Sequence, residues 1–366
     1  MQRSYCIVAA FLAFSGALLL NVAPSTADPL PNQILKFQQL PLNNAGPIPA
    51  PYTGPYISPN TGVPFPPLVT PPPLQPVAPF PGHDELSTAY AQHDPQSNAL
   101  IGWQGQYMAD DFADRFESPV VHVRWWGSYM QQQQFAGVKR FLISFESDVP
   151  AVPPSPENPN GLPSHPGVPL LNQIVSFTPG PLTPSSGLYT ETPVPTPGGP
   201  FPEALYQYNA ELNLGKEFPE LANTVYWLKI VALVDADQEG PIQWGWHDRD
   251  WAVPDYLASV PPAVIPGEGI VGLLGAGGPP VWHFQDDAVT GALSIIQTAN
   301  PIMPDVIQQP TWIPQNYIFP LDGPDGIQQF SKDLAFELYT VPEPAGMMLI
   351  GVATLLGGMR SRRRTA

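Results

Sequence analysis

The sequence predicts an all-β chain, and the expected architecture is a β-sandwich of jelly-roll type with long Pro-rich loops. Proline accounts for 52 of the 366 residues, about three times the usual share of roughly 5 %, and it disfavours helix interiors and central strands. Several short runs are rich in β-branched and aromatic residues, as strands are. No long stretch shows capped helical periodicity. These three observations favour short strands joined by irregular connections.

The first two strand candidates each place apolar side chains on one face. Segment 120–126 (VVHVRWW) alternates Val121, Val123 and Trp125 with residues of the opposite face, because neighbouring strand residues point to opposite sides. Its two adjacent tryptophans therefore cannot belong to one surface. Segment 141–145 (FLISF) places its first, third and fifth residues on one side. Both segments are expected to border a core.

Two later candidates complete the predicted core. Segment 224–234 (TVYWLKIVALV) is apolar on both faces, which is typical of a central strand that is covered on both sides. Segment 333–341 (DLAFELYTV) directs Leu334, Phe336 and Leu338 inward. We expect all four segments to belong to one β domain.

Composition divides the chain into four parts: 1–27, a signal peptide; 28–84, a Pro-rich linker; 85–340, the β-sandwich domain; and 341–366, a sorting segment with a short transmembrane helix. The linker is expected to be a semi-rigid spacer of polyproline or irregular backbone. Inside the domain, the Pro-rich stretches around 150–202 and 252–280 are expected to be long loops at the ends of the sheets.

The charge distribution is strongly acidic. All 31 acidic residues lie between Asp28 and Glu343, where only nine of the 14 basic residues are found, so this region carries a net charge of −22 against −17 for the whole chain. Nucleic-acid affinity comes largely from Lys and Arg on phosphates, so nucleic acid is excluded as a partner. An acidic surface suits solubility outside the cell and loose binding of divalent cations.

Cysteine use is minimal. The only cysteine is Cys6, within the predicted signal peptide. A mature chain without cysteine has no disulfide, no thiol nucleophile and no thiolate metal ligand. Its stability must therefore come from packing.

The N-terminal segment has the layout of a secretory signal peptide. Arg3 precedes an apolar run from Ile7 to Leu20, and small residues follow at 25–27. This order predicts export and cleavage by signal peptidase after Ala27. The alternative is an N-terminal membrane anchor.

The C-terminal segment combines an apolar run with a basic end. A helix over 345–359 would rise about 22 Å, which is short of the roughly 30 Å of a hydrocarbon core. The four arginines Arg360, Arg362, Arg363 and Arg364 would hold its end on the cytoplasmic side. Pro342 and Pro344 favour an extended backbone around Glu343, which suits a protease cleft.

The tail VPEPAGMMLIGVATLLGGMRSRRRTA resembles the PEP-CTERM sorting signal, in the order and spacing of its parts and in its position at the chain end. The resemblance implies that an exosortase, a membrane-embedded transpeptidase-like enzyme, processes the chain near Pro342-Glu343-Pro344. It also implies a transient anchor in the inner membrane and delivery to the cell envelope or the extracellular matrix, often in bacteria that produce exopolysaccharide. The alternative is a simple tail anchor.

A second resemblance covers most of residues 100–340 and is to an uncharacterised exported domain that is common in PEP-CTERM proteins. The pieces that carry it are ADDF (109–112), VRWWGSY (123–129), DVP (148–150), YWL (226–228), WGW (244–246), DDAV (286–289) and DLAFEL (333–338). It implies one β-rich domain and no particular activity.

The acidic run DADQEG offers a candidate calcium site. Asp235, Asp237 and Glu239 alternate along a turn and could supply oxygens to Ca²⁺, which takes about six to eight of them. The remaining positions of an EF-hand loop are lacking. The alternative for this run, as for Asp110-Asp111, is a solvated turn or a strand-end cap.

The segment WGWHDRDW is the candidate glycan-binding site. Trp244 and Trp246 could stack on sugar rings while Asp248 and Asp250 accept hydrogen bonds from hydroxyl groups. In the alternative interpretation the two indoles pack inward with a period of two, and Arg249 pairs with a neighbouring aspartate on the surface.

Enzyme motifs are lacking. The sequence holds no nucleophile elbow, zinc-protease motif or phosphate-binding glycine loop, and its six histidines show no metal-ligand spacing. We therefore expect a non-catalytic surface or matrix protein. A carbohydrate-binding module for exopolysaccharide, with or without calcium, is the second interpretation. A glycoside hydrolase is the third, because the separation of paired carboxylates is a tertiary property.

Overall fold

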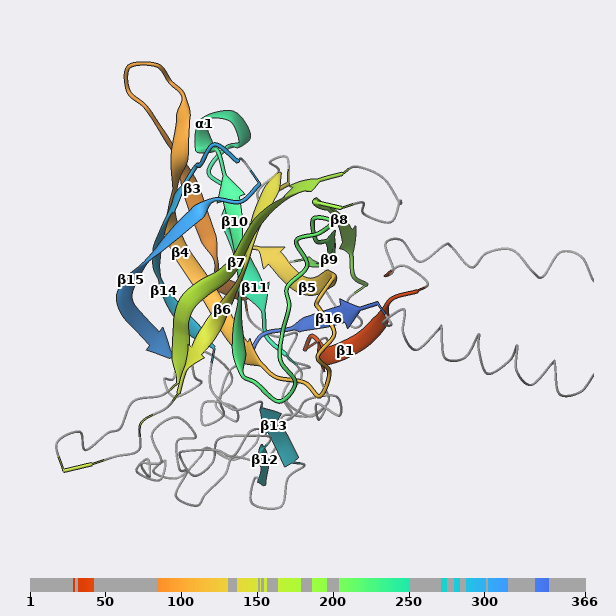
Figure 1. Cartoon of the computed structure of the whole chain (residues 1–366). Coiled ribbons are helices and arrows are strands. Elements are labelled where there is room, and N and C mark those ends of the chain that lie inside the picture. The colour runs from red at the N-terminus through yellow and green to blue at the C-terminus, as the bar shows by residue number, and fades with distance from the viewer. Residues whose placement is uncertain are drawn as a thin grey trace, which may run out of the picture.

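The computed structural model describes residues 29, 32–42, 84–130, 137–150, 152, 155–156, 164–178, 186–195, 204–249, 271–274, 280–283, 288–300, 302–314 and 333–341. Within this part of the chain, strands hold 62 % of the residues and helices 2 %. The predicted all-β class is therefore confirmed (Figure 1).

The elements follow one another as β1 (Ile34–Gln39), β2 (Asp84–Leu86), β3 (Thr88–His93), β4 (Leu100–Phe112), β5 (His122–Tyr129), β6 (Arg140–Val149), β7 (His165–Phe177), β8 (Leu188–Pro193), β9 (Leu205–Glu211), β10 (Tyr226–Val234), α1 (Ala236–Glu239), β11 (Trp244–His247), β12 (Val271–Leu274), β13 (Pro280–His283), β14 (Val289–Ile296), β15 (Asp305–Pro314) and β16 (Phe336–Thr340). β12 and β13 form a separate two-stranded sheet, and the other strands form one large mixed sheet.

Strand β10 lies at the centre of the large sheet. All nine of its residues are buried. It pairs with β6 along one edge, and with β4 and then β3 along the other. The prediction of a central strand covered on both faces is confirmed, and the apolar character of both faces is its physical cause.

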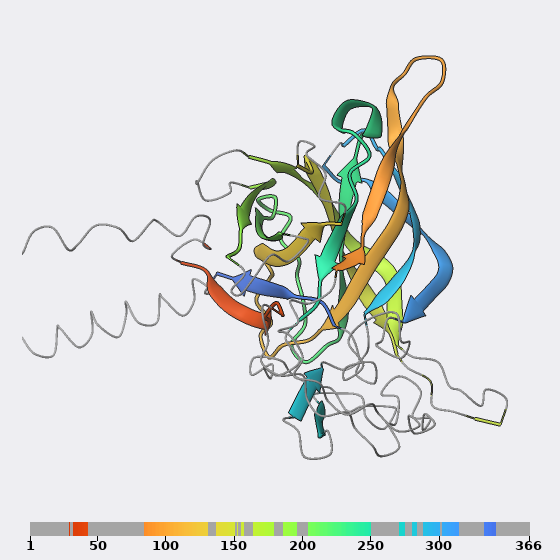
Figure 2. The same ribbon diagram turned by 180° about the vertical axis from the view of Figure 1, so that it is seen from behind.

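The strand pairings close into a circuit. From β5 the ladder runs through β9, β8, β7, β6 and β10 to β3. β3 continues β2 across Ser87, β2 pairs with β11, and β11 pairs back onto β5. Seen from behind, β16 and β1 extend this circuit on the side of β5 (Figure 2). The closed ladder encloses the main apolar core.

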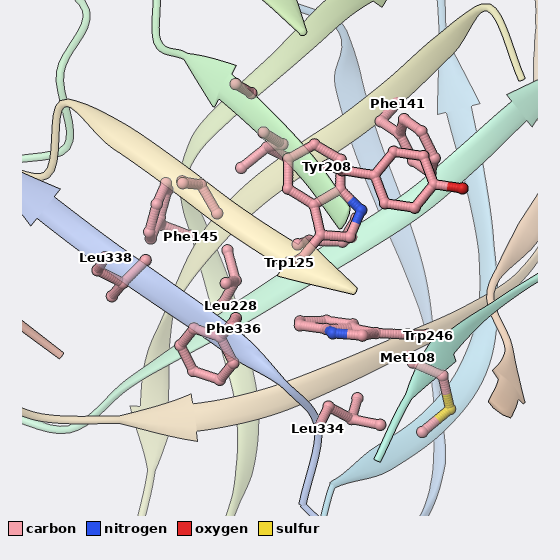
Figure 3. Packing of buried hydrophobic residues seen from close by; sticks show 14 of the residues in the cluster. Met108, Trp125, Phe141, Phe145, Tyr208, Leu228, Trp246, Leu334, Phe336 and Leu338 are labelled. Carbon is pink, nitrogen blue, oxygen red and sulfur yellow. The ribbon is translucent and has the colours of Figure 1, made fainter. Parts of the chain in front are cut away.

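The main core is dominated by aromatic rings. Trp125 stacks on Tyr208 with ring centroids 5.4 Å apart, and Phe141 meets Trp244 edge-on at 4.8 Å. Figure 3 shows Trp125, Tyr208 and Phe141 in the same cluster as Phe336 and Leu338 of β16. Leu334, Phe336 and Leu338 all point into this cluster, as predicted.

A second apolar cluster lies on the other face of β10 and β6. Trp227, Val231 and Leu142 belong to it, together with residues of β4 and β14. The β14–β15 hairpin returns toward β7, where the Ile174 amide donates to the Ile302 carbonyl at 2.9 Å. Successive residues of β10 point to opposite faces, and each face packs against one of the two clusters. Both faces of β10 are therefore apolar.

Two sequence expectations about Pro-rich regions need correction. Residues 34–39 were expected within the linker, yet they form β1, which pairs with β16, because Phe37 enters the main core. The stretches 150–202 and 252–280 were expected to be long loops, yet the first contains β7 and β8, and the second contains β12 and the first residue of β13. Pro166 and Pro169 are tolerated in β7 because β8 pairs only with its last two residues and the register against β6 shifts there.

The remaining expectations about the chain ends and the linker lie outside the described residues. They concern Ala27, residues 43–83 and the segment 342–366. Among the described residues, no helix is long and apolar enough to cross a membrane.

Candidate functional site

The two tryptophans of the candidate glycan site lie on β11 and are fully buried. The Trp244 indole N–H donates to the Tyr208 hydroxyl at 3.0 Å, and that of Trp246 donates to the Ala335 carbonyl at 2.9 Å. Both rings belong to the main core. Neither ring has a free face for a sugar, so the inward packing of the alternative interpretation is what the structure has.

The polar residues that follow β11 are also buried. Asp248 is 1 % exposed, and Arg249 forms an ion pair of 3.1 Å with Asp333. The expectation of a surface pair for Arg249 is therefore corrected. Asp250 lies outside the described residues.

His247, the last residue of β11, is held between two acceptors. Its Nδ1 lies 2.9 Å from Asp84 Oδ1, and its Nε2 lies 2.8 Å from the Leu42 carbonyl oxygen. Burial lowers the pKa of His247, but the Asp84 carboxylate and the other acceptors outweigh this effect and raise the pKa to about 9. The ring is therefore an imidazolium that donates from both nitrogens.

Ser128 completes a trio that resembles catalytic residues in composition only. Its hydroxyl donates to Asp84 Oδ2 at 2.7 Å. In a nucleophilic triad the serine bonds to the imidazole, whose free nitrogen takes its proton. Here the serine bonds to the carboxylate, and both nitrogens of His247 face acceptors. The trio therefore stabilises the contact of β2, β5 and β11 and has no general base.

Asp110, for which the sequence left a calcium ligand, a solvated turn or a strand-end cap open, is fully buried on β4. Its Oδ2 accepts from the Leu334 amide at 2.7 Å. Burial raises the pKa of Asp110 well above its ordinary value, and the nearby Asp333 carboxylate adds to the rise. A protonated Asp110 is the form that burial favours.

A third buried group joins β1 to the loops after β4 and before β10. Lys36 Nζ lies 2.5 Å from Glu220 Oε1 and 3.5 Å from Asp114 Oδ2. Burial is the main cause that raises the pKa of Glu220 to about 9, and Asp114 adds to it. Lys36 therefore faces two carboxyl groups, those of Asp114 and Glu220, whose protonated forms are favoured by burial.

These buried groups lie on or near strands β1, β2, β4, β11 and β16. We call them the polar seam: Lys36, Asp84, Asp110, Asp114, Glu220, His247, Arg249 and Asp333. Perturbed pKa values often mark functional sites, but structural ion-pair networks produce them too. The contacts given above join segments far apart in the sequence, which favours the structural role.

The acidic run after β10 forms a different constellation from the predicted one. His93, Asp235 and Asp237 each offer a ligand atom, and these atoms lie within 4.8 Å of one another. Glu239, the third predicted ligand, instead faces Arg140 at 3.5 Å. Within the part of the chain that the structure describes, these three residues are the group that could hold a metal ion.

Sequence spacing gave no signal for His93, which is 142 positions before Asp235. The parallel pairing of β3 and β10 brings the two together, because Tyr90 is the partner of Val234 and both strands end at the same edge. Figure 1 shows α1 beside the turn that joins β3 and β4. Only a prediction of this pairing would have found the histidine.

Comparison with known proteins gives one family and no individual relative. A domain of unknown function, DUF7901, matches residues 72–261, which is slightly more than half of the chain. No curated protein matches, and no solved structure matches. The matched residues include every strand from β2 to β11 and the three residues of the candidate metal site. The chain therefore belongs to the DUF7901 family.

Proposed function

We propose that this chain is an exported, non-catalytic protein of the cell surface or the extracellular matrix, and that an exosortase-type enzyme sorts it. The observation that carries the proposal is the tail of residues 341–366. Pro342-Glu343-Pro344 is followed there by an apolar run and an arginine cluster. The signal-peptide layout of residues 1–27 supports the same route out of the cell.

The position of the motif next to the folded domain suits such processing. β16 ends at Thr340, so Pro342 begins only two residues beyond the last strand. All five residues of β16 are buried. Processing at the motif would therefore release the complete β domain and leave its core intact.

The domain itself supports a structural role. The Trp and His side chains that might have served chemistry on β11 are used internally, and the polar seam links β1 and β16 to the rest of the sheet. For the finer architecture we still propose a jelly-roll-like arrangement, in which the two layers belong to the one mixed sheet that closes through β2 and β11. The second apolar cluster between β10 and the β14 layer supports a layered arrangement.

A carbohydrate-binding function gains no support from β11. It relied on exposed indoles on β11, and both rings are buried. A hydrolase likewise gains no support from the Ser128, Asp84 and His247 trio, whose bonding order is wrong for a nucleophile.

The test is to alter the sorting motif in a host that has the matching exosortase. The triple change of Pro342, Glu343 and Pro344 to alanine should leave a larger, membrane-retained protein, detected by immunoblotting of membrane and medium fractions. Glu117→Ala, at an exposed glutamate of the domain, is the control and should be processed as wild type. Unchanged processing of the triple variant would overturn the proposal.

A further inference from the structure

We propose that His93, Asp235 and Asp237 bind a first-row transition-metal cation such as Zn²⁺. The bound cation would clamp the turn between β3 and β4 to the turn between β10 and α1. The fold brings these two turns to one edge of the sheet, and the donor atoms already lie within 4.8 Å of one another. The inference is independent of the route by which the protein is exported.

The imidazole of His93 is oriented by a built turn. Its Nδ1 lies 3.2 Å from the Asn98 carbonyl oxygen. That turn is closed by the Asp94 amide, which donates to Ala99, and by the Asp94 carboxylate, which accepts from two amides at 2.8 Å. A carbonyl oxygen only accepts, so in a neutral ring Nδ1 carries the hydrogen and Nε2 presents its lone pair. Metal-binding histidines are held in this way.

The lone-pair side of His93 faces a carboxylate. Nε2 lies 3.3 Å from Asp235 Oδ2. In the part of the chain that the structure describes, neither Nε2 of His93 nor Oδ1 of Asp235 has a hydrogen-bond partner, although both atoms are buried. The Asp235 side chain is only 6 % exposed. A buried carboxylate oxygen without a partner is costly, and a cation held by the His93 imidazole and the Asp235 carboxylate would offset this cost.

The local backbone adds to this observation. Asp235 occupies the N-cap position of α1, where an aspartate ordinarily accepts a hydrogen bond from the first turn. Its side chain makes no such bond. The carboxylate therefore lies toward His93 at the expense of the cap.

The spacing of the donors fits a small tetrahedral cation. Two ligands bound to zinc at about 2.1 Å lie about 3.4 Å apart when the site is tetrahedral. The observed 3.3 Å between His93 Nε2 and Asp235 Oδ2 agrees with this value. Asp237 is exposed, so its carboxylate can move to complete the third position without disturbing the core.

The donor set favours a transition metal over calcium. Calcium takes about six to eight oxygens, whereas imidazole nitrogen suits Zn, Cu, Fe and Ni. The sequence-based set of Asp235, Asp237 and Glu239 offered only oxygens. The structure-based set contains His93 in place of Glu239. Because this ligand set includes an imidazole nitrogen, we expect a transition-metal cation and not calcium.

Isothermal titration of the full-length chain in detergent, stripped with EDTA, tests the proposal. Zn²⁺ should bind with a stoichiometry of one and raise the melting temperature, and Ca²⁺ at the same concentration should do neither. His93→Gln and Asp235→Asn should weaken Zn²⁺ binding at least tenfold. His165→Gln, at a half-buried histidine of β7, and Glu239→Gln are the controls and should bind as wild type.

A second measurement separates loss of the ligand from loss of the fold. Circular dichroism should show that each variant is folded. The visible absorption of bound Co²⁺ should disappear in His93→Gln and remain in His165→Gln. Equal Zn²⁺ binding by wild type and His93→Gln would overturn the proposal and leave a simple ion pair between His93 and Asp235. Preference for Ca²⁺, together with its loss in Glu239→Gln, would also overturn it, in favour of an all-oxygen site.

Discussion

The buried pair of His247 and Asp84 should make the stability of the domain depend on pH in the alkaline range. Burial lowers the pKa of His247, but the Asp84 carboxylate, together with Asp248 and the Leu42 carbonyl, outweighs burial, so the pKa rises from 6.5 to about 9 on folding. A pKa that is higher in the folded state contributes stability that is fully present below about pH 6.5 and is lost as the pH rises through about 9. The difference between the two pKa values corresponds to about 3 kcal/mol.

Urea denaturation of the wild type and of His247→Gln at pH 6, 8 and 10 measures this contribution. Other groups titrate in the same range, so the relevant quantity is the difference in unfolding free energy between the two proteins at each pH. At pH 6 we expect the variant to be less stable by about 3–5 kcal/mol, because Asp84 loses its charged partner in a buried position. At pH 10 the difference should be smaller by about 3 kcal/mol.

The control and the contradicting result are equally specific. Val168→Ala, at an exposed and non-titrating residue of β7, should follow the wild type at every pH. A difference between wild type and His247→Gln that is the same at pH 6 and pH 10 would refute the reasoning, because it would mean that His247 is not protonated in the fold.

Two packing predictions follow from the main core and are checked by urea denaturation with unchanged m-values. Phe141→Ala should lower the free energy of unfolding by about 3–5 kcal/mol, because its ring packs against Trp244 with centroids 4.8 Å apart. Val168→Ala, at a residue 63 % exposed, should lower it by less than about 0.5 kcal/mol. Similar losses for the two variants would contradict the assignment of Phe141 to the core. Gly127→Ala should lose about 1–3 kcal/mol or more, because the new Cβ would lie 2.3 Å from the Trp244 ring. Gly215→Ala meets no atom within 4 Å but has φ +74° and should cost about 1 kcal/mol; equal losses at the two glycines would argue against the close approach at Gly127.

The parts of the fold that sequence predicts are those in which each side chain reports its own surroundings. Segment 224–234 was predicted to be central because both of its faces are apolar, and β10 is buried along its whole length. Trp125 and Trp126 were predicted to face opposite sides. Trp125 enters the main core, while Trp126 packs in a small separate cluster. The alternation of side chains along a strand is a local property, so it can be predicted without knowing which strands pair with it.

The parts that sequence misses depend on partners far along the chain. Asp110 reads as a solvated residue, but the amide of Leu334 and the field of Arg249 make its burial tolerable. His93 gains a role only through the parallel pairing of β3 with β10. β1 was missed because it lies in a region whose overall proline content indicates a spacer. Most prolines of that region lie after residue 40, beyond β1.

The folded unit extends beyond the residues that the family match covers. β1 and β16 lie outside 72–261, yet Phe37 and Phe336 are fully buried in the main core, with their rings stacked 5.1 Å apart. Lys36 of β1 is the cation of a buried group that includes Asp114. A piece limited to the match would lose Lys36 from this group and would leave the core open on the side of β1 and β16. The match therefore marks the centre of the domain, and the boundary lies at β1 and β16.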